Sequence, residues 1–214
     1  MGVQVKICGI NTAGALHAAR DAGADFIGLV FYPESPRNVT IAQAAELAAN
    51  AECIEVVALT VDASDELLRE IVNAVRPGYL QLHGNESQGR VAEIRELTGT
   101  KIIKAVKAGS EAAVRDAIRF EAVADIILFD APPPSGDASL PGGNGETFDW
   151  TILRSTQLRP NFMLSGGLNP DNVRRAIEIG GASSVDVSSG VEDAPGHKNA
   201  GLIERFVTQA KSLY

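Results

Sequence analysis

The chain has few cysteines. Only two occur in 214 residues, Cys8 and Cys53, with no CxxC pair and no histidine at metal-ligand spacing. A disulfide framework and a zinc site both need denser clusters of such residues. The sequence therefore predicts neither a disulfide nor a metal site.

Long apolar runs and clustered positive charge are also missing. No run approaches the roughly 18 apolar residues that a membrane-spanning helix requires, and the N-terminus lacks the features of a secretory signal. The 19 basic residues are outnumbered by 27 acidic ones and form no Lys/Arg stripe. Nucleic-acid-binding surfaces are usually basic. We therefore expect a cytoplasmic protein with neither a nucleic acid nor a membrane as a partner.

What the sequence does have is one pattern repeated along its length. Apolar segments that read as strands alternate with stretches of helical periodicity. In the stretch 64–75, Ser64 is expected to be the N-cap of a helix whose apolar side chains share one face. The expected strands are 3–10, 25–31, 54–62, 79–84, 101–107, 125–131, 161–167 and 183–189.

Eight strand–helix units favour an α/β fold, the closed (β/α)8 TIM barrel. We expect residues 1–214 to form this barrel as a single domain. Strands that are apolar almost throughout suit a parallel sheet covered by helices. An open doubly wound sheet is the alternative, but no GxGxxG or Walker A loop follows the first strand. The Pro/Gly-rich residues 132–146 are expected to form a mobile loop after the sixth strand.

The loop after the seventh strand has the features of an anion site. In "LSGGLNPDNV", Gly166 and Gly167 precede Asn169, an expected N-cap, and Pro170 at the first helical position. Backbone N–H groups at such a helix start are free to bind an anion. The glycines of this loop taken alone could equally serve only a turn.

The loop after the eighth strand repeats this arrangement. In "DVSSGVED", Ser188, Ser189 and Gly190 precede what we expect to be a short extra helix. The loops after strands seven and eight are the usual phosphate site of such barrels. Together the two loops favour a phosphorylated small molecule as the ligand.

Other polar residues also fall at the expected strand ends, where the active site of a barrel lies. Asp130 ends a buried strand, where a carboxylate is costly unless it is paired or functional. Arg37 could hold a carboxylate through two hydrogen bonds, although a solvated loop arginine fits equally well. His83 fits a structural histidine better than a catalyst. Cys53 lies at the opposite face, where we expect it to serve packing.

Several short segments occur together in one order: "KICGI", "FYPESPR", "LQLHGNE", "FDW", "LSGGLNPDNV", "DVSSGVE" and "PGHKN". In this combination the chain resembles the phosphoribosylanthranilate isomerase family of tryptophan biosynthesis over nearly its whole length. The resemblance implies a barrel that converts N-(5-phosphoribosyl)anthranilate to 1-(2-carboxyphenylamino)-1-deoxyribulose 5-phosphate. It implies an acid/base Amadori rearrangement with no metal and no cofactor. We expect the protein to be a monomer or a homodimer.

The resemblance also implies roles for single residues. Cys8 would be the general base and Asp130 the general acid, while Arg37 would hold the anthranilate carboxylate. His83 and Asp186 are expected beside the substrate. The phosphate would be held by Gly166, Gly167, Ser188, Ser189 and Gly190.

A thiol acts as a base only when it is ionised. We therefore expect the pKa of Cys8 to be lowered by backbone N–H groups or by a cation such as Lys6 or Arg37. The chain departs from the family at Asn11, where threonine is frequent, and at Glu146, where lysine is frequent.

Two other functions stay open at this stage. The analogous isomerase of histidine synthesis would show a second glycine-rich loop after strand three or four and an aspartate at the first strand end, whereas here "TVDASDE" and "LHGNES" lack Gly-Gly. A catalytically silent barrel that only binds a phosphorylated metabolite is the second alternative.

Overall fold

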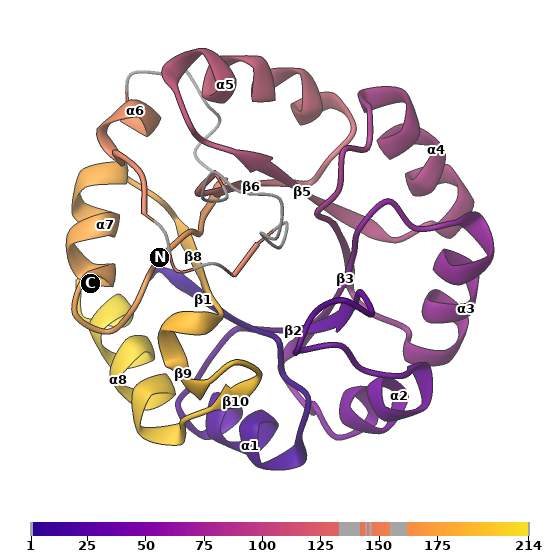
Figure 1. Cartoon of the computed structure of the whole chain (residues 1–214), viewed down its shortest axis with the longest axis horizontal. Helices are drawn as coiled ribbons and strands as arrows, with labels where there is room; N and C mark the ends of the chain where they lie inside the picture. The colour runs from indigo at the N-terminus through magenta and orange to yellow at the C-terminus, as the bar shows by residue number, and fades with distance from the viewer. Residues whose placement is uncertain (1, 133–141, 144, 146, 155–161, 214) are drawn as a thin grey trace.

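The computed structural model describes residues 2–132, 142–143, 145, 147–154 and 162–213. Eight parallel strands form a closed barrel in chain order, and helices surround it (Figure 1). The barrel closes where β1 (Gln4–Cys8) pairs with β8 (Ser184–Val187), with Val5 opposite Val185. This closure confirms the (β/α)8 barrel and excludes the open sheet.

All eight predicted strands are confirmed, although most are shorter than the apolar segments that predicted them. Between β1 and β8 lie β2 (Phe26–Phe31), β3 (Glu55–Thr60), β4 (Tyr79–Leu82), β5 (Lys101–Lys107), β6 (Ile126–Asp130) and β7 (Phe162–Leu164). The helices are α1 (Ala13–Asp21), α2 (Ile41–Ala49), α3 (Asp65–Val75), α4 (Gln88–Thr98), α5 (Glu111–Asp116), α6 (Thr151–Arg154), α7 (Val173–Gly180) and α8 (Ala200–Lys211), with a 3₁₀ turn, η1 (Ala117–Ala122), after α5.

The α3 helix forms for the reasons that its sequence suggests. The Ser64 side chain accepts a hydrogen bond from the Leu67 N–H and so caps the first turn. Leu68, Ile71 and Val75, spaced by three or four residues, are buried against the barrel. The predicted cap and apolar face are therefore both confirmed.

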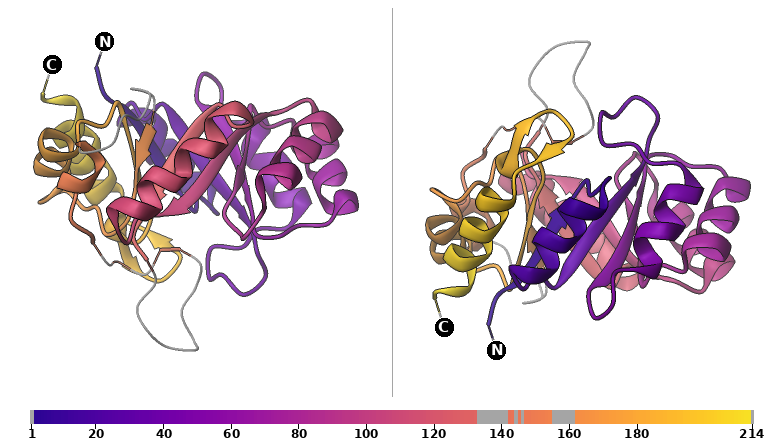
Figure 2. Two further views of the ribbon diagram at one scale, coloured as in Figure 1. Left: turned by 90° about the horizontal axis from the view of Figure 1, so that it is seen from above. Right: turned by 90° about the horizontal axis from the view of Figure 1, so that it is seen from below.

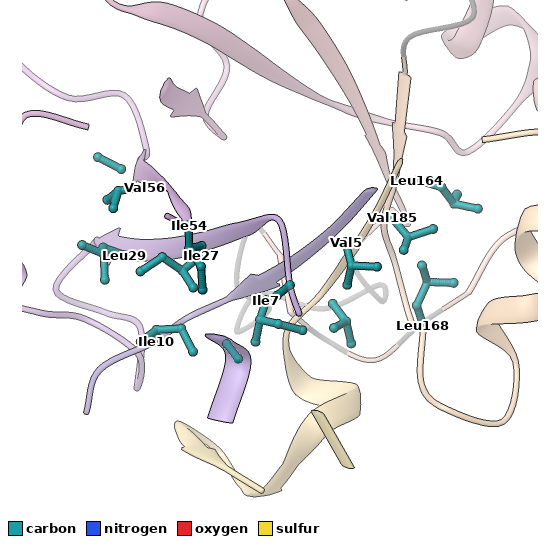
Figure 3. Packing of buried hydrophobic residues seen from close by; sticks show 14 of the residues in the cluster. Val5, Ile7, Ile10, Ile27, Leu29, Ile54, Val56, Leu164, Leu168 and Val185 are labelled. Atoms are coloured by element: carbon teal, nitrogen blue, oxygen red, sulfur yellow. The ribbon is translucent and has the colours of Figure 1, made fainter. Parts of the chain in front are cut away.

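The side chains of each strand alternate between two cores. One side packs against the helices, where Val5, Ile7 and Ile27 belong to the larger apolar cluster (Figure 3). The other side points into the barrel. On β1 this alternation places Ile7 outside and both Lys6 and Cys8 inside.

The two ends of the barrel differ in what they carry. Figure 2 shows the two ends of the described chain together at one end of the barrel, and the small hairpin of β9 (Glu192–Ala194) and β10 (His197–Lys198) at the other. This hairpin was not predicted. Its strands are short and polar, so they lack the apolar alternation by which the barrel strands are detected.

Two predictions outside the barrel strands are wrong and one is confirmed. Asn169 is not the N-cap of α7, because regular helix begins only at Val173; its side chain instead accepts hydrogen bonds from the N–H groups of Asp171 and Asn172 and closes a preceding turn. The expected short extra helix is present as a three-residue 3₁₀ helix, η2 (Ser189–Val191). Cys53 is exposed and does not serve packing. The predicted loop 132–146 lies largely outside the described residues.

Candidate active site

A pocket is lined by the carboxyl ends of the strands and the loops that follow them. In barrels of this kind, the carboxyl ends of the strands are where small-molecule sites lie. One part of its wall is apolar and consists of Val30, Leu59 and Val61 beside Tyr32. The polar residues around it are Cys8, Ser35, Arg37, Gln81, His83, Asp130, Ser165, Asp186, Ser188 and Ser189. Every predicted site residue except Gly190 therefore lines this one pocket, Gly166 and Gly167 included.

Cys8 occupies the end of β1 and is buried. Gly28 on the neighbouring strand leaves the space for its thiol, because a Cβ at position 28 would lie 2.8 Å from Cys8 Sγ. Burial raises the pKa of Cys8 above its ordinary value, while the positive charges of Lys6 and Lys198 act in the opposite direction. The expectation of a lowered pKa is therefore wrong for the free protein, since desolvation outweighs the two cations.

A buried ion pair lies next to Cys8. Lys6 Nζ donates to Asp186 Oδ1 at 2.9 Å, and Ser165 Oγ donates to Asp186 Oδ2 at 3.1 Å. The pKa of Lys6 is raised because the charges of Asp186 and Cys8 together outweigh the effect of burial. Asp186 was predicted to lie beside the substrate; it does line the pocket, and its described hydrogen-bond partners are Lys6 and Ser165.

Asp130 ends β6 on another side of the pocket. Its Oδ1 accepts from the Ala131 N–H at 3.0 Å, and its Oδ2 lies 3.2 Å from His83 Nε2. His83 Nδ1 in turn lies 2.9 Å from Gln81 Nε2, so the amide and the ring fix the orientation of the carboxyl group. His83 thus contacts a predicted catalytic residue, which sequence reasoning did not foresee.

Arg37 is buried, so the alternative of a solvated loop arginine is wrong. Its Nε and Nη2 each donate to one carboxylate oxygen of Glu192, both at 2.8 Å. Lys198 Nζ donates to the same carboxylate at 2.6 Å. Desolvation raises the pKa of Glu192, but the hydrogen bonds and charges of Arg37 and Lys198 outweigh it and leave that pKa lowered. Glu192 and Lys198 were both missed; they lie in "SSGVE" and "PGHKN", segments whose only available signal was the family resemblance.

The loops after β7 and β8 approach each other closely. Gly166 and Gly167 have φ of +87° and +60°, a region that glycine adopts without strain. A Cβ on Gly166 would lie 2.4 Å from the Ala131 nitrogen, and one on Gly190 would lie 1.9 Å from the Leu168 oxygen. Gly190 is therefore required for the contact between the two loops and does not line the pocket. Within the described residues, the N–H groups of Gly166 and Gly167 make no hydrogen bond.

Metal ligands are not grouped in this site. Among the residues that the structure describes, no three His, Cys, Asp or Glu side chains are placed so that they could hold a metal ion. In the same part of the chain, no helix is long and apolar enough to cross a membrane.

Comparison with known proteins identifies the family. The sequence profile of N-(5'-phosphoribosyl)anthranilate (PRA) isomerase matches residues 5–209. An N-(5'-phosphoribosyl)anthranilate isomerase of Rhodopseudomonas palustris is 49% identical over 213 residues, which cover 99% of this chain and 97% of the relative. The chain belongs to the phosphoribosylanthranilate isomerase family.

Solved phosphoribosylanthranilate isomerases share the whole barrel. The enzyme from Thermotoga maritima superposes with a TM-score of 0.88 at 34% identity, covering 99% of this chain and 100% of that one. A second phosphoribosylanthranilate isomerase structure, with a TM-score of 0.85 at 33% identity and the same coverage, holds reduced 1-(o-carboxyphenylamino)-1-deoxyribulose 5-phosphate. Monomers derived from the dimeric Thermotoga maritima isomerase have also been solved and match equally well.

The phosphoribosylanthranilate isomerase assignment excludes one of the two alternatives that the sequence left open. The match covers the first strand with Cys8, both glycine-rich loops and the β9–β10 hairpin. The histidine-synthesis isomerase is therefore the wrong alternative. Asn11, where the chain departs from the family, donates its side-chain N–H to the Gly196 carbonyl at 3.0 Å and so ties the loop after β1 to the hairpin. Glu146, the other departure, lies outside the described residues.

Proposed function

We propose that this protein converts N-(5'-phosphoribosyl)anthranilate to 1-(2-carboxyphenylamino)-1-deoxyribulose 5-phosphate in tryptophan biosynthesis, and that the two reacting side chains are Cys8 and Asp130. Family membership over residues 5–209 supports the reaction. The single observation that supports the two residues is their common pocket: a thiol from β1 and a carboxyl group from β6 line the same space.

The pocket offers a complementary place for each part of this substrate. The apolar wall of Val30, Leu59 and Val61 suits the anthranilate ring, and Arg37 is a cation in reach of the ring's carboxylate. The phosphate is assigned to the free N–H groups of the loop after β7, together with the hydroxyl groups of Ser188 and Ser189. The ribose would then lie beside Cys8 and Asp130, which line the same pocket.

The chemistry requires one acid and one base. Asp130, when protonated, gives its proton to the ribose ring oxygen; the bond from C1 to that oxygen breaks, and the nitrogen lone pair forms a Schiff base at C1. The Cys8 thiolate then removes the proton from C2, and the C–H electron pair forms the C1–C2 double bond of an enolamine. The enolamine becomes the ketone when C1 gains a proton and the C2 hydroxyl loses one.

The raised pKa of Cys8 has two consequences for this step. A raised pKa lowers the ionised fraction of the thiol at a given pH, and with it the amount of active base in the free protein. The thiolate that does form is a stronger base than an ordinary cysteine, which favours abstraction of a carbon-bound proton. Lys6 and Lys198 limit the rise of the pKa and so keep the thiolate accessible.

Loss of substrate fluorescence tests the reaction directly. Purified protein mixed with freshly made phosphoribosylanthranilate should show turnover, and Cys8→Ala and Asp130→Asn should each lose several orders of magnitude in kcat while keeping the wild-type circular dichroism spectrum. Cys53→Ser, at the exposed cysteine, is the matched control and should behave as wild type. Near-wild-type activity in either active-site variant would refute that assignment, and tight binding of the reduced product without turnover would favour a silent binding protein.

Localisation and assembly also belong to this proposal. We infer that the protein acts in the cytoplasm, where a biosynthetic enzyme of this family finds its substrate, and that it is a monomer or a homodimer. Light scattering coupled to gel filtration measures the assembly state. A larger assembly would contradict this expectation.

A further inference from the structure

Arg37 uses one side of its guanidinium group to bind Glu192. Nε donates to Oε1 and Nη2 donates to Oε2, both at 2.8 Å, and the two side chains are only 7% and 4% exposed. Glu192 is held in turn by Lys198 Nζ at 2.6 Å from Oε1 and by the Gly196 N–H at 3.2 Å from Oε2. All four of these contacts on the carboxylate favour a single orientation of Arg37.

The other side of the guanidinium group is left for a ligand. A guanidinium has five N–H donors and can bind a carboxylate bidentately either through Nε and Nη2 or through Nη1 and Nη2. Glu192 takes the first pair, and no hydrogen bond from the described residues reaches Nη1. We call the Nη1–Nη2 side the free edge of Arg37. Nη1 lies beside Gly143, where a Cβ would be 2.7 Å away, and both residues line the pocket.

The aliphatic part of Arg37 is fixed as well. Gly9, in the loop after β1, has φ of +80°, and a Cβ there would lie 2.6 Å from Arg37 Cδ. The side chain therefore lies directly on the backbone of Gly9 and is clamped by Glu192 at its tip. Such a prearranged cation loses little conformational freedom when an anion binds.

We propose that Glu192 is a positioning residue that aims the free edge of Arg37 at the substrate carboxylate and thereby sets the preference for a ligand that carries one. This inference rests on the proposed function, in which Arg37 binds that carboxylate. Glu192 itself does not touch the reacting atoms; it acts through Arg37.

Charge and position make opposite predictions for this residue. Glu192 is an anion close to the place proposed for another anion, so Coulomb repulsion alone predicts that its removal tightens binding of the carboxylate. Positioning predicts that its removal weakens binding, because Arg37 would lose two hydrogen bonds and its fixed orientation. The sign of the effect therefore separates the two accounts.

Two ligands and the full-length chain are sufficient for the test. Calorimetry gives the Kd of reduced 1-(o-carboxyphenylamino)-1-deoxyribulose 5-phosphate and of the same molecule without its carboxyl group. In Glu192→Gln, which keeps the size but loses the charge, we expect Kd to rise at least about tenfold for the carboxyl ligand and less than about twofold for the other. Asp193→Asn removes the same charge from an exposed position of the same hairpin and should change neither value.

Three results would overturn the inference: unchanged binding of the carboxyl ligand in Glu192→Gln, tighter binding, or an equal loss for both ligands, which would indicate a general disturbance of the site. Glu192→Asp keeps the negative charge but moves it away from Arg37 by one methylene group. This variant should also lose the preference for the carboxyl ligand, and it replaces Glu192→Gln in the test if that variant fails to fold.

Arg37→Ala separates this inference from the proposed function. If Arg37→Ala keeps the full preference, the assigned role of Arg37 fails; if only the Glu192 variants keep it, the positioning role alone fails.

Discussion

The buried pair of Lys6 and Asp186 gives a stability prediction with a defined size. Asp186→Ala removes the only carboxylate within hydrogen-bond distance of Lys6 among the described residues and leaves a lysine with no exposed surface. With an effective dielectric constant of about 20, a charge pair at 2.9 Å is worth about 6 kcal/mol. The free energy of unfolding that Asp186→Ala loses has an upper limit. Rather than stay charged without a partner, Lys6 can give up its proton, which costs about 5 kcal/mol at pH 7.

We therefore expect Asp186→Ala to lower the free energy of unfolding by about 3–5 kcal/mol at pH 7. The loss should also depend on pH. In the wild type the pKa of Lys6 is raised in the folded protein. The contribution of Lys6 to the free energy of unfolding is therefore constant below the pKa of an unfolded lysine, and it is lost only as the pH rises through the higher pKa of the folded protein. In Asp186→Ala we expect the pKa of Lys6 to be lower in the folded protein than in the unfolded chain. The unfolded chain then binds one more proton than the folded protein. The difference between the two proteins should shrink by about 1.4 kcal/mol per pH unit between pH 7 and 9.

Urea denaturation at pH 7, 8 and 9 measures both effects. The double variant Lys6→Met with Asp186→Leu removes both charges and should be more stable than Asp186→Ala, because no charge is left buried without a partner. A loss below about 1 kcal/mol, or one that stays constant with pH, would refute the reasoning, since it would mean that water or another anion reaches Lys6.

Three further variants test individual features. In a Cys53→Ser background, the midpoint of the pH profile for alkylation of Cys8 by iodoacetamide should lie above the ordinary thiol value of about 8.5, because burial raises its pKa; a midpoint below 8 would contradict this balance. Gly28→Ala should lower kcat at least about tenfold by displacing the Cys8 thiol, whereas Gly14→Ala, where a Cβ meets nothing within 4 Å, should not. Ser64→Ala should cost about 1 kcal/mol in urea denaturation through loss of the α3 cap, and an unchanged midpoint would show that the cap contributes nothing.

The fold could be predicted because its signals are local. Each barrel strand is an apolar segment of at most seven residues, and the helix periodicity between them is visible in the chain itself. The start of α7 was misplaced because Asn169 and Pro170 carry the same signals for a turn as for a helix. Local sequence does not distinguish the two, since the hydrogen bonds of the following residues decide between them.

The site was predictable in its residues but not in its interactions. Arg37 and Glu192 are 155 positions apart, and the chain holds 27 acidic residues, so charge alone could not select the partner. The pKa of Cys8 depends on how burial balances charges brought from β1, β8 and the hairpin, a sum that exists only in the folded barrel. The same applies to His83, whose contact with Asp130 joins the ends of β4 and β6.

The closure of β1 on β8 also affects how the protein can be made. Lys6 and Asp186 are separated by 180 positions, so the strand that carries Lys6 and Cys8 is synthesised well before the aspartate that pairs with Lys6. A nascent chain that has emerged only as far as β7 has no carboxylate from β8 to accept the Lys6 charge. During translation the barrel should therefore stay open until β8 has left the ribosome. Until then the apolar surfaces of the earlier strands are exposed, and such surfaces are what chaperones bind.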